Sequence, residues 1–369
     1  MKPKILFILH VPPPVHGSSV VGQNIKESLI INQSFNCNYI NLGTSRTVDE
    51  IGKNALQKLG RYLSIINQVL KQLITNKPQL CYIAITAKGT AFYKDAVIAL
   101  LVKLFRVKLV YHFHNKGVST RQNKTMDNFL YQQVFRNTHA ILLSKYLYPD
   151  VEKYFTLERV HYCPNGISET AISRQPSANS NHTEILFLSN LIESKGVFVL
   201  LEACKILKQK GIAFHCTIVG GEGDVDAHQF QKKVEELDLS DQVIYVGKKY
   251  GTEKKEFFLS ADIFVFPTYY YYETFGLVNL EAMQHYLPIV STFEGGIPDI
   301  VENERTGYLV PQQDATALAE KLETLILNPA LRKQMGTAGR AKYEKEFTLE
   351  AFEERLKGIL NEIISSKNE

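Results

Sequence analysis

Two glutamates, Glu273 and Glu281, lie eight residues apart around the start of a predicted helix. The apolar run from Ile263 to Phe266 is typical of a buried strand, and four tyrosines connect it to Glu273. Gly276 then begins a segment of helical apolar period that carries Glu281. The amino end of such a helix has a partial positive charge and faces the carboxyl edge of the strand. The segment therefore predicts an anion-binding site of the kind found in α/β proteins.

Three further residues follow predicted strands and could reach a similar ligand. Lys195 comes after the strand Ile185–Leu188 and could pair with a phosphate, although a surface lysine would look the same. His114 ends the strand Val107–Phe113, where polar side chains project into the ligand crevice of a doubly wound sheet. Spacing by itself leaves a structural role for His114 equally open. Gly17 would let a backbone approach phosphate, but it also suits an ordinary strand–helix turn.

Two other functions, glycoside hydrolysis and dinucleotide binding, fit the sequence less well. Glycoside hydrolases hold two carboxyl groups about 5–9.5 Å apart, whereas a continuous helix from Glu273 to Glu281 would separate them by about 12 Å in rise. A partly looped connection could close that gap. The loop Gly220–Gly223 lacks the GxGxxG pattern of dinucleotide binding, and its Glu222 would repel a pyrophosphate. A division of labour fits better, with Glu273 facing a sugar and Glu281 binding diol hydroxyls, unless both are solvated acids.

Strands and helices are predicted to alternate along almost the whole chain. This pattern indicates an α/β protein with two doubly wound parallel sheets. The polar segment 169–183 has few apolar residues and is the expected boundary between the two domains. A length of 369 residues is sufficient for two domains.

Charge is distributed unevenly along the chain. Residues 1–165 contain 21 Lys and Arg against 8 Asp and Glu, whereas residues 166–369 contain 21 against 30. The basic first half predicts an anionic partner. The amphipathic segment Asp49–Lys77 suits an anionic membrane surface or a lipid-diphosphate carrier, and equally a solvated basic face. No recognition module for nucleic acid is evident, so that partner is not expected.

Other features of the composition predict an intracellular location. The five cysteines are scattered and form no CxxC pair, so we expect reduced thiols in a cytoplasm and no zinc site. The apolar run near the amino terminus is short and ends in three prolines, which favours a first strand over a signal peptide. No stretch approaches the ~20 apolar residues that a membrane span requires.

Taken together, the motifs resemble glycosyltransferase family 4, the retaining enzymes of the GT-B fold, over nearly the whole chain. The most specific signature is E-x7-E, which runs here from Glu273 to Glu281. Four segments add supporting matches: Glu193–Gly196, Pro164–Ile167, Gly295–Asp299 and Thr306–Pro311. The resemblance implies two Rossmann-like domains facing across a cleft. Acceptors would bind to residues 1–168 and the donor to residues 184–347, after a linker at 169–183, while a helix at 348–369 would pack back toward the first domain.

The resemblance also implies roles for the residues near the sugar. Glu281 would hold the ribose hydroxyls of a nucleotide, and Glu273 would contact the donor sugar. His114 would bond a sugar hydroxyl beside the reacting carbon. Backbone amides near the donor would come from Phe275, Gly276 and Leu277.

The diphosphate is the one place where the chain departs from the family pattern. The resemblance implies that Lys195 neutralises the diphosphate and that Gly17 lets the backbone approach it. Family members often have a Gly-Arg-Leu whose arginine binds the diphosphate, but here Asn190 occupies that position. Asn190 can donate a hydrogen bond but has no charge. Without that arginine, Lys195 would be the main cation that binds the diphosphate, or Lys116 or Lys248 would supply part of the positive charge.

The predicted activity, as the resemblance implies it, is a retaining, hexosyl-type transfer. A sugar would pass from a nucleotide diphosphate, commonly a UDP-sugar, to a hydroxyl of a glycan or lipid-linked acceptor in bacterial capsule or O-antigen synthesis. Neither a metal nor another cofactor is expected. The location would be cytoplasmic, with peripheral contact at the cytoplasmic face of the inner membrane left open. Two alternatives stay open, a nucleotide-sugar epimerase of similar fold and a non-catalytic sugar-nucleotide binder.

Overall fold

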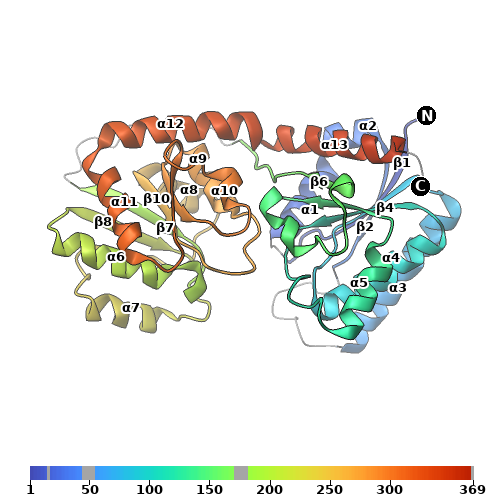
Figure 1. Ribbon diagram of the computed structural model, residues 1–369, viewed down its shortest axis with the longest axis horizontal. Coiled ribbons are helices and arrows are strands. Elements are labelled where there is room, and N and C mark those ends of the chain that lie inside the picture. Colours follow the sequence, from blue (N-terminus) through green and yellow to red (C-terminus); the bar gives the residue numbers. More distant parts are fainter. Residues whose placement is uncertain (15–16, 44–54, 170–181, 367–369) are drawn as a thin grey trace. The chain divides into compact units, whose positions relative to one another are not determined.

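The protein consists of two compact α/β units. The computed structural model describes residues 1–14, 17–43, 55–169 and 182–366. One unit contains Met1–Gly166 together with Leu349–Glu369, and the other contains Ile167–Thr348. Each unit has a six-stranded sheet whose strands pair in parallel and are connected by helices (Figure 1). The predicted class, α/β with two doubly wound parallel sheets, is confirmed.

The sheet of the first unit has the strand order β2-β1-β3-β4-β5-β6. The strands are β1 (Lys4–Leu9), β2 (Asn36–Asn41), β3 (Leu80–Ile83), β4 (Lys108–Phe113), β5 (His139–Leu142) and β6 (Val160–Tyr162). Five of the six residues of β1 are buried, as its almost continuous apolar sequence predicts for a strand covered on both faces. The chain leaves β1 toward β2 on one side and later occupies β3 on the other, so the order reverses between β1 and β3.

Helices from both ends of the chain cover this first sheet. In the described residues they are α1 (Gly17–Glu27), α2 (Leu29–Ser34), α3 (Ala55–Thr75), α4 (Gly89–Leu104), α5 (Thr125–Phe135) and α13 (Leu349–Ser365). Two 3-10 helices, Lys145–Asp150 and Leu157–Arg159, precede β6. The last helix, α13, packs on the core of the first unit beside α2 (Figure 1), with Phe352, Leu356 and Leu360 buried against Ile5 and Phe35.

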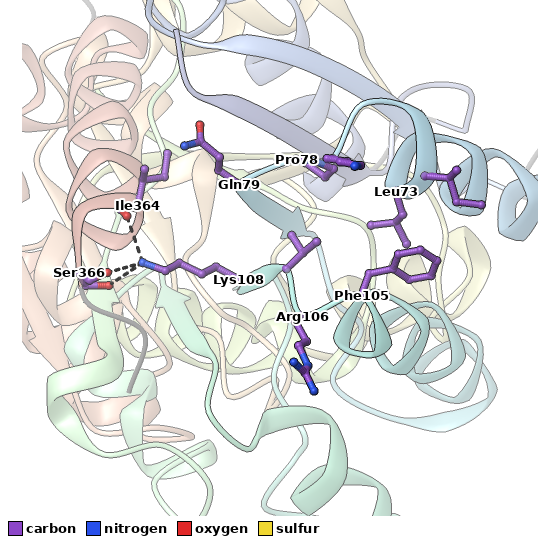
Figure 2. Close-up of a pocket in the computed structure, with 11 residues that line it drawn as sticks. Leu73, Pro78, Gln79, Phe105, Arg106, Lys108, Ile364 and Ser366 are labelled. Carbon is purple, nitrogen blue, oxygen red and sulfur yellow. Dashed lines mark hydrogen bonds between the residues drawn. The ribbon is translucent and has the colours of Figure 1, made fainter. Parts of the chain in front are cut away.

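A pocket of about 690 Å³ lies where α13 ends against the sheet (Figure 2). Lys108, the first residue of β4, donates from Nζ to the carbonyl oxygens of Ile363 and Ile364, both at 3.0 Å, and to Ser366. The lysine thereby satisfies carbonyl groups that the end of α13 leaves without helical partners. The pocket is at the amino ends of β3 and β4, whereas ligands of doubly wound sheets bind at the carboxyl ends. We therefore assign it no part in the predicted site.

The second unit has the strand order β12-β11-β10-β7-β8-β9. The strands are β7 (Thr183–Leu188), β8 (Phe214–Val219), β9 (Val243–Tyr245), β10 (Ile263–Phe266), β11 (Ile289–Thr292) and β12 (Gly307–Val310). The helices are η4 (Glu193–Lys195), α6 (Val197–Gln209), α7 (Ala227–Glu236), α8 (Gly251–Ser260), α9 (Leu277–Gln284), α10 (Ile297–Ile300), α11 (Ala315–Leu327) and α12 (Pro329–Glu346). The order reverses between β7 and β10, which makes their carboxyl ends the switch point of this sheet.

Several predicted elements differ from the observed ones. The helical pattern of the sequence from about Val20 to Ile31 predicts one helix. The structure has two, because the Ser28 hydroxyl accepts from the Ile31 backbone at 3.1 Å and caps α2. Helix α5 was not among the predicted elements. Of the amphipathic segment Asp49–Lys77, α3 covers Ala55–Thr75, and residues 49–54 lie outside the described residues. Most of the predicted linker 169–183 also lies outside them, at 170–181.

Candidate active site

Two loops meet at the switch point of the second sheet and are tied together through their backbones. The turn that holds Lys195 follows β7, and the tyrosine loop follows β10. Tyr269 donates from its backbone nitrogen to the Ser194 carbonyl oxygen at 2.8 Å. Gly196 has φ +88, and a Cβ there would lie 2.1 Å from the Pro267 carbonyl oxygen. Only glycine allows so close an approach in this conformation, so the glycine fixes Lys195 beside the tyrosine loop.

This arrangement brings Lys195 and Glu273, two of the predicted residues, into direct contact. Nζ of Lys195 lies 2.5 Å from Oε2 of Glu273, and both side chains are mostly buried. The ammonium group also lies 4.5 Å from the centroid of the Tyr270 ring, within the range of a cation–π interaction. Burial, and then the charge of Glu273, raises the pKa of the Tyr270 hydroxyl, so the ring stays neutral. The candidate phosphate-binding cation is thus held by a carboxylate and an aromatic face.

The backbone of Glu273 is held by the Gly295–Gly296 turn that follows β11. Gly296 donates from its nitrogen to the Thr274 carbonyl oxygen at 2.8 Å. Gly295 has φ +53, and a Cβ there would lie 2.3 Å from the Glu273 carbonyl oxygen. Three successive strand ends, those of β7, β10 and β11, therefore combine to place one carboxylate.

Helix α9 begins beside this carboxylate with a glycine in the left-handed conformation. Gly276 is the N-cap residue with φ +74, Phe275 before it is buried, and Leu277 is the first helical residue. Asn279, in the first turn, is fully buried, and neither Oδ1 nor Nδ2 has a hydrogen-bond partner among the described residues. A buried amide of this kind calls for a ligand or water. Sequence reasoning missed Asn279, because nothing in a single sequence marks it as buried.

Glu281 lies in α9, two residues after Asn279, and has a partner that the sequence did not suggest. Nζ of Lys254, in α8, lies 2.6 Å from its Oε1. The other carboxylate oxygen, Oε2, is buried and has no hydrogen-bond partner within the described part of the chain. Both side chains line a pocket of about 580 Å³ between α8 and α9. The carboxylate predicted to bind the ribose thus has one oxygen paired with a lysine and one buried oxygen that lacks a partner among the described residues.

Asn190 and Lys248 lie together near the same edge of the sheet. Oδ1 of Asn190 accepts from the Gly221 backbone at 3.1 Å, so the residue in the arginine position holds a neighbouring loop. A Cβ on Gly221 would lie 3.3 Å from this Oδ1 and 3.3 Å from Cδ of Lys248. Nζ of Lys248 lies 4.9 Å from the ring centroid of Tyr250. Lys248 is therefore placed beside the position where the family arginine is missing.

The remaining predicted residues, His114, Gly17 and Lys116, belong to the first unit. The His114 ring packs against that of His112, with centroids 4.1 Å apart and planes inclined by 39°, and Nδ1 of His112 lies 2.6 Å from the Tyr82 hydroxyl. Burial, and then the neighbouring His114, holds the pKa of His112 well below its usual value, so His112 is neutral. Gly17 is the first residue of α1 rather than a loop residue, and a Cβ there would meet nothing within 4 Å. Lys116 follows β4 and is half-buried.

One segment, Asp224–Asp226, has an Asp-x-Asp pattern that sequence reasoning passed over. Oδ1 of Asp224 accepts from the Glu193 backbone at 2.7 Å, and Oδ1 of Asp226 accepts from the Gln229 backbone at 2.7 Å. Both carboxylates are therefore engaged in holding backbone. Within the described residues, no group of three or more His, Cys, Asp or Glu could hold a metal ion, and no helix is long and apolar enough to cross a bilayer.

Comparisons with known proteins bear on the fold and on the second unit. Residues 168–342 match the family model described as glycosyl transferases group 1, which covers almost the whole second unit. The chain is similar over 97% of its length to Anabaena Alr3699/HepE in complex with UDP-glucose, with a TM-score of 0.70, 18% identity and 99% of that chain covered. The fold is therefore the GT-B fold, and the matched family model supports a glycosyltransferase.

Relatives of known sequence are named for polysaccharide synthesis. The chain is 30% identical to the putative colanic acid biosynthesis glycosyltransferase WcaL of Escherichia coli over 70% of its own length and 65% of the relative. It is 32% identical to the amylovoran biosynthesis glycosyltransferase AmsK of Erwinia amylovora over 71% of its own length and 66% of the relative. The matched part thus spans slightly less than two thirds of each relative.

Proposed function

We propose that this protein is a retaining, metal-independent hexosyltransferase that uses a UDP-sugar. The acceptor in this proposal is a hydroxyl of a glycan or lipid-linked sugar in bacterial surface polysaccharide synthesis. The observation that carries the proposal is the Lys195–Glu273 pair at the switch point, because it places a cation and an acceptor of hydroxyl hydrogen bonds side by side. The names of the two relatives support the polysaccharide, and the UDP-glucose complex of the structural neighbour supports the donor.

The donor side of the reaction follows from the charges at this edge. Diphosphate oxygens would compete with Glu273 for Lys195 and take over its charge. The released Glu273 carboxylate would then accept hydroxyl hydrogen bonds from the donor sugar. Negative charge that develops on the departing diphosphate would be stabilised by Lys195 and by the amino end of α9 at Gly276.

We propose that configuration is retained by attack on the face from which the diphosphate leaves. In that step the bond from the anomeric carbon to the diphosphate oxygen breaks and a bond to the acceptor oxygen forms. The acceptor proton passes to the departing diphosphate, so no protein nucleophile is needed. His114, packed on a neutral His112, would bond a sugar hydroxyl beside the reacting carbon.

A thermal-shift screen against nucleoside diphosphates and their sugars tests the donor. A ligand that binds only the folded protein raises its melting temperature, by an increment that grows with concentration over Kd. We expect UDP and at least one UDP-sugar to give the largest shifts, without added metal and in the presence of a chelator. If a nucleoside diphosphate with another base raises the melting temperature more than UDP does, the donor is not a uridine nucleotide. The anomeric coupling in the product of an acceptor assay then decides retention, and turnover of donor without acceptor would favour an epimerase.

We also propose that the first unit contacts an anionic membrane through α3. Leu56, Leu59 and Leu63 are 85%, 53% and 56% exposed, and their spacing of three and four residues places them on one face. The helix contains three basic residues and no acidic one: Lys58, Arg61 and Lys71. Exposed leucines flanked by basic residues are typical of helices that lie in a bilayer interface.

Co-sedimentation with vesicles tests this surface. We expect binding to vesicles that contain anionic phosphatidylglycerol, little binding to neutral phosphatidylcholine, and weaker binding at high salt. The double variant Leu59→Ser/Leu63→Ser should lose binding. Leu104→Ser, at a leucine that is 79% exposed on α4, is the matched control and should bind as the native protein does. Equal binding to neutral and anionic vesicles would show that attraction between α3 and anionic lipid does not cause the binding.

A further inference from the structure

The Lys254–Glu281 pair spans the groove between α8 and α9. Nζ to Oε1 is 2.6 Å, and the two side chains are 30% and 25% exposed. Oε2 of the same carboxylate is buried and has no hydrogen-bond partner among the described residues. An orphaned carboxylate oxygen is costly, since it has lost water without gaining a donor. The carboxylate is therefore asymmetric, with one oxygen bound to a lysine on another helix and the other buried without a hydrogen-bond donor among the described residues.

The groove itself has the volume of a small-molecule site. Its volume is about 580 Å³, within the usual range for small-molecule pockets. Phe258 and His285 form an aromatic wall, with ring centroids 5.1 Å apart and planes inclined by 15°. Nδ1 of His285 lies 2.7 Å from the backbone carbonyl oxygen of Glu281, which fixes the His285 ring against α9.

We propose that Lys254 is a positioning residue that presents Oε2 of Glu281 to the vicinal diol of a nucleotide ribose. This inference rests on the proposed function, because it assumes that a nucleoside diphosphate occupies the groove. A free glutamate side chain would have to give up rotamer freedom on binding. Lys254 fixes the carboxylate beforehand through one oxygen and leaves Oε2 for the hydroxyl donors. If Lys254 only balanced the charge of Glu281, there would be no reason for Oε2 to lack a hydrogen-bond donor.

The proposal predicts a loss of affinity that depends on the ribose hydroxyls. Immobilising one such side chain in advance corresponds to roughly a threefold to tenfold change in Kd. Lys254→Ala should weaken UDP binding by that factor and leave the binding of 2′,3′-dideoxy-UDP nearly unchanged. Lys254→Arg, which keeps a cation within reach of Oε1, should recover most of the loss. The quantity measured is the coupling between Lys254 and the ribose hydroxyls. It is the difference between the effect of Lys254→Ala on UDP binding and its effect on 2′,3′-dideoxy-UDP binding, as in a double-mutant cycle.

The control is a second Lys–Glu pair that joins two helices of the same unit. Nζ of Lys210, the C-cap residue of α6, lies 2.5 Å from Oε2 of Glu323 in α11, and neither residue lines the groove. Lys210→Ala should leave both affinities as they are in the native protein. Melting temperatures without nucleotide show whether each variant is folded, and Lys254→Gln replaces Lys254→Ala if the latter is not.

The experiment is calorimetric titration of UDP and its dideoxy analogue into the full chain and each variant. A loss confined to UDP and recovered by Lys254→Arg supports the proposal. Unchanged UDP binding in Lys254→Ala, or an equal loss for both nucleotides, overturns it while leaving the proposed function intact. If the native chain binds neither UDP nor any other nucleoside diphosphate, the proposed function fails first, and the inference fails with it.

Discussion

At the scale of single residues, the candidate donor site consists of two lysine–glutamate pairs with different surroundings. Lys195 and Glu273 are mostly buried and lie beside an aromatic ring, whereas Lys254 and Glu281 line an open groove. In both pairs the cation neutralises the glutamate without ligand, which limits the cost of burying either charge. A bound diphosphate would replace the carboxylate at Lys195. A ribose would instead join the pair at Glu281 without displacing its lysine.

The first prediction concerns Lys195. Lys195→Ala should lower kcat by about 10²–10³, since it removes a charge that stabilises the leaving diphosphate in the transition state. It should raise the Kd of the free sugar by a far smaller factor, because the sugar does not contact the lysine in this proposal. Steady-state and single-turnover kinetics with a UDP-sugar measure the effect. Wild-type turnover in this variant would sink the assignment, and Lys210→Ala is the control for loss of an ion pair.

At the scale of elements, the strand ends and helix starts hold the carboxylates through glycines. The second prediction is that Gly295→Ala impairs donor binding. Its Cβ would lie 2.3 Å from the Glu273 carbonyl oxygen, so the loop that holds the carboxylate must move. Gly211→Ala is the matched control, because Gly211 also has a left-handed φ of +71 but open space around it.

Gly211→Ala should therefore cost only the conformational term, about 1–2 kcal/mol of unfolding free energy. Gly295→Ala should cost more than that and should also raise the Kd of the donor. Chemical denaturation and nucleotide titration separate the two effects. Equal destabilisation by the two substitutions, with unchanged donor affinity in both, would show that the contact with Glu273 is unimportant.

The third prediction concerns a buried acid that ties α4 to the loop after β3. Asp95 is buried, and its Oδ2 accepts from the Thr86 backbone at 2.8 Å. Burial raises its pKa from 3.8 to about 7, an effect that the hydrogen bond from Thr86 only partly offsets. The folded protein therefore binds this proton more tightly than the unfolded chain does. The stabilisation is present below pH 4 and is lost as the pH rises through about 7.

Asp95→Asn cannot release that proton and should remove this contribution to the pH dependence. Between pH 5 and pH 8 the melting temperature of the native protein should fall relative to that of the variant. Asp238→Asn, at a side chain that is 92% exposed, is the control and should follow the native curve. Parallel curves for the native protein and Asp95→Asn would contradict the raised pKa.

At the scale of the whole molecule, the last helix belongs to the core of the first unit although it follows the second unit in sequence. Leu356 of α13 is fully buried there with Ile5 and Ile25. The fourth prediction is that Leu356→Ala destabilises the first unit by about 2–5 kcal/mol, because it removes buried apolar volume. Leu327→Ala, at a leucine of the second unit that is 64% exposed, should change stability by no more than about 0.5 kcal/mol.

Scanning calorimetry of the full chain, with and without UDP, measures this difference. UDP should raise the transition of the unit that binds it, which identifies the other transition as that of the first unit. Leu356→Ala should lower the transition that UDP does not raise. If it lowers only the UDP-sensitive transition, α13 is not a stabilising part of the first unit.

The sequence by itself determined the fold class and most of the strands. Apolar runs such as Ile263–Phe266 become buried parallel strands, because period and composition are local properties. The same local logic placed Glu273, Lys195 and His114 at strand ends, since parallel strands share a carboxyl edge. The same reasoning did not predict α5. It also predicted one helix across Ser28, where the side chain of Ser28 caps α2 and separates it from α1.

Only the tertiary structure decided which charges meet. Lys195 and Glu273 are 78 residues apart in the chain, and Lys254 and Glu281 are 27 apart, so no local period relates them. Each pair depends on the order of strands in the sheet and on close approaches such as that of Gly196 to Pro267. Strand order is set by packing of the whole unit rather than by any one segment. Lys254 and Asn279 could therefore be assigned to the candidate site only from the tertiary structure.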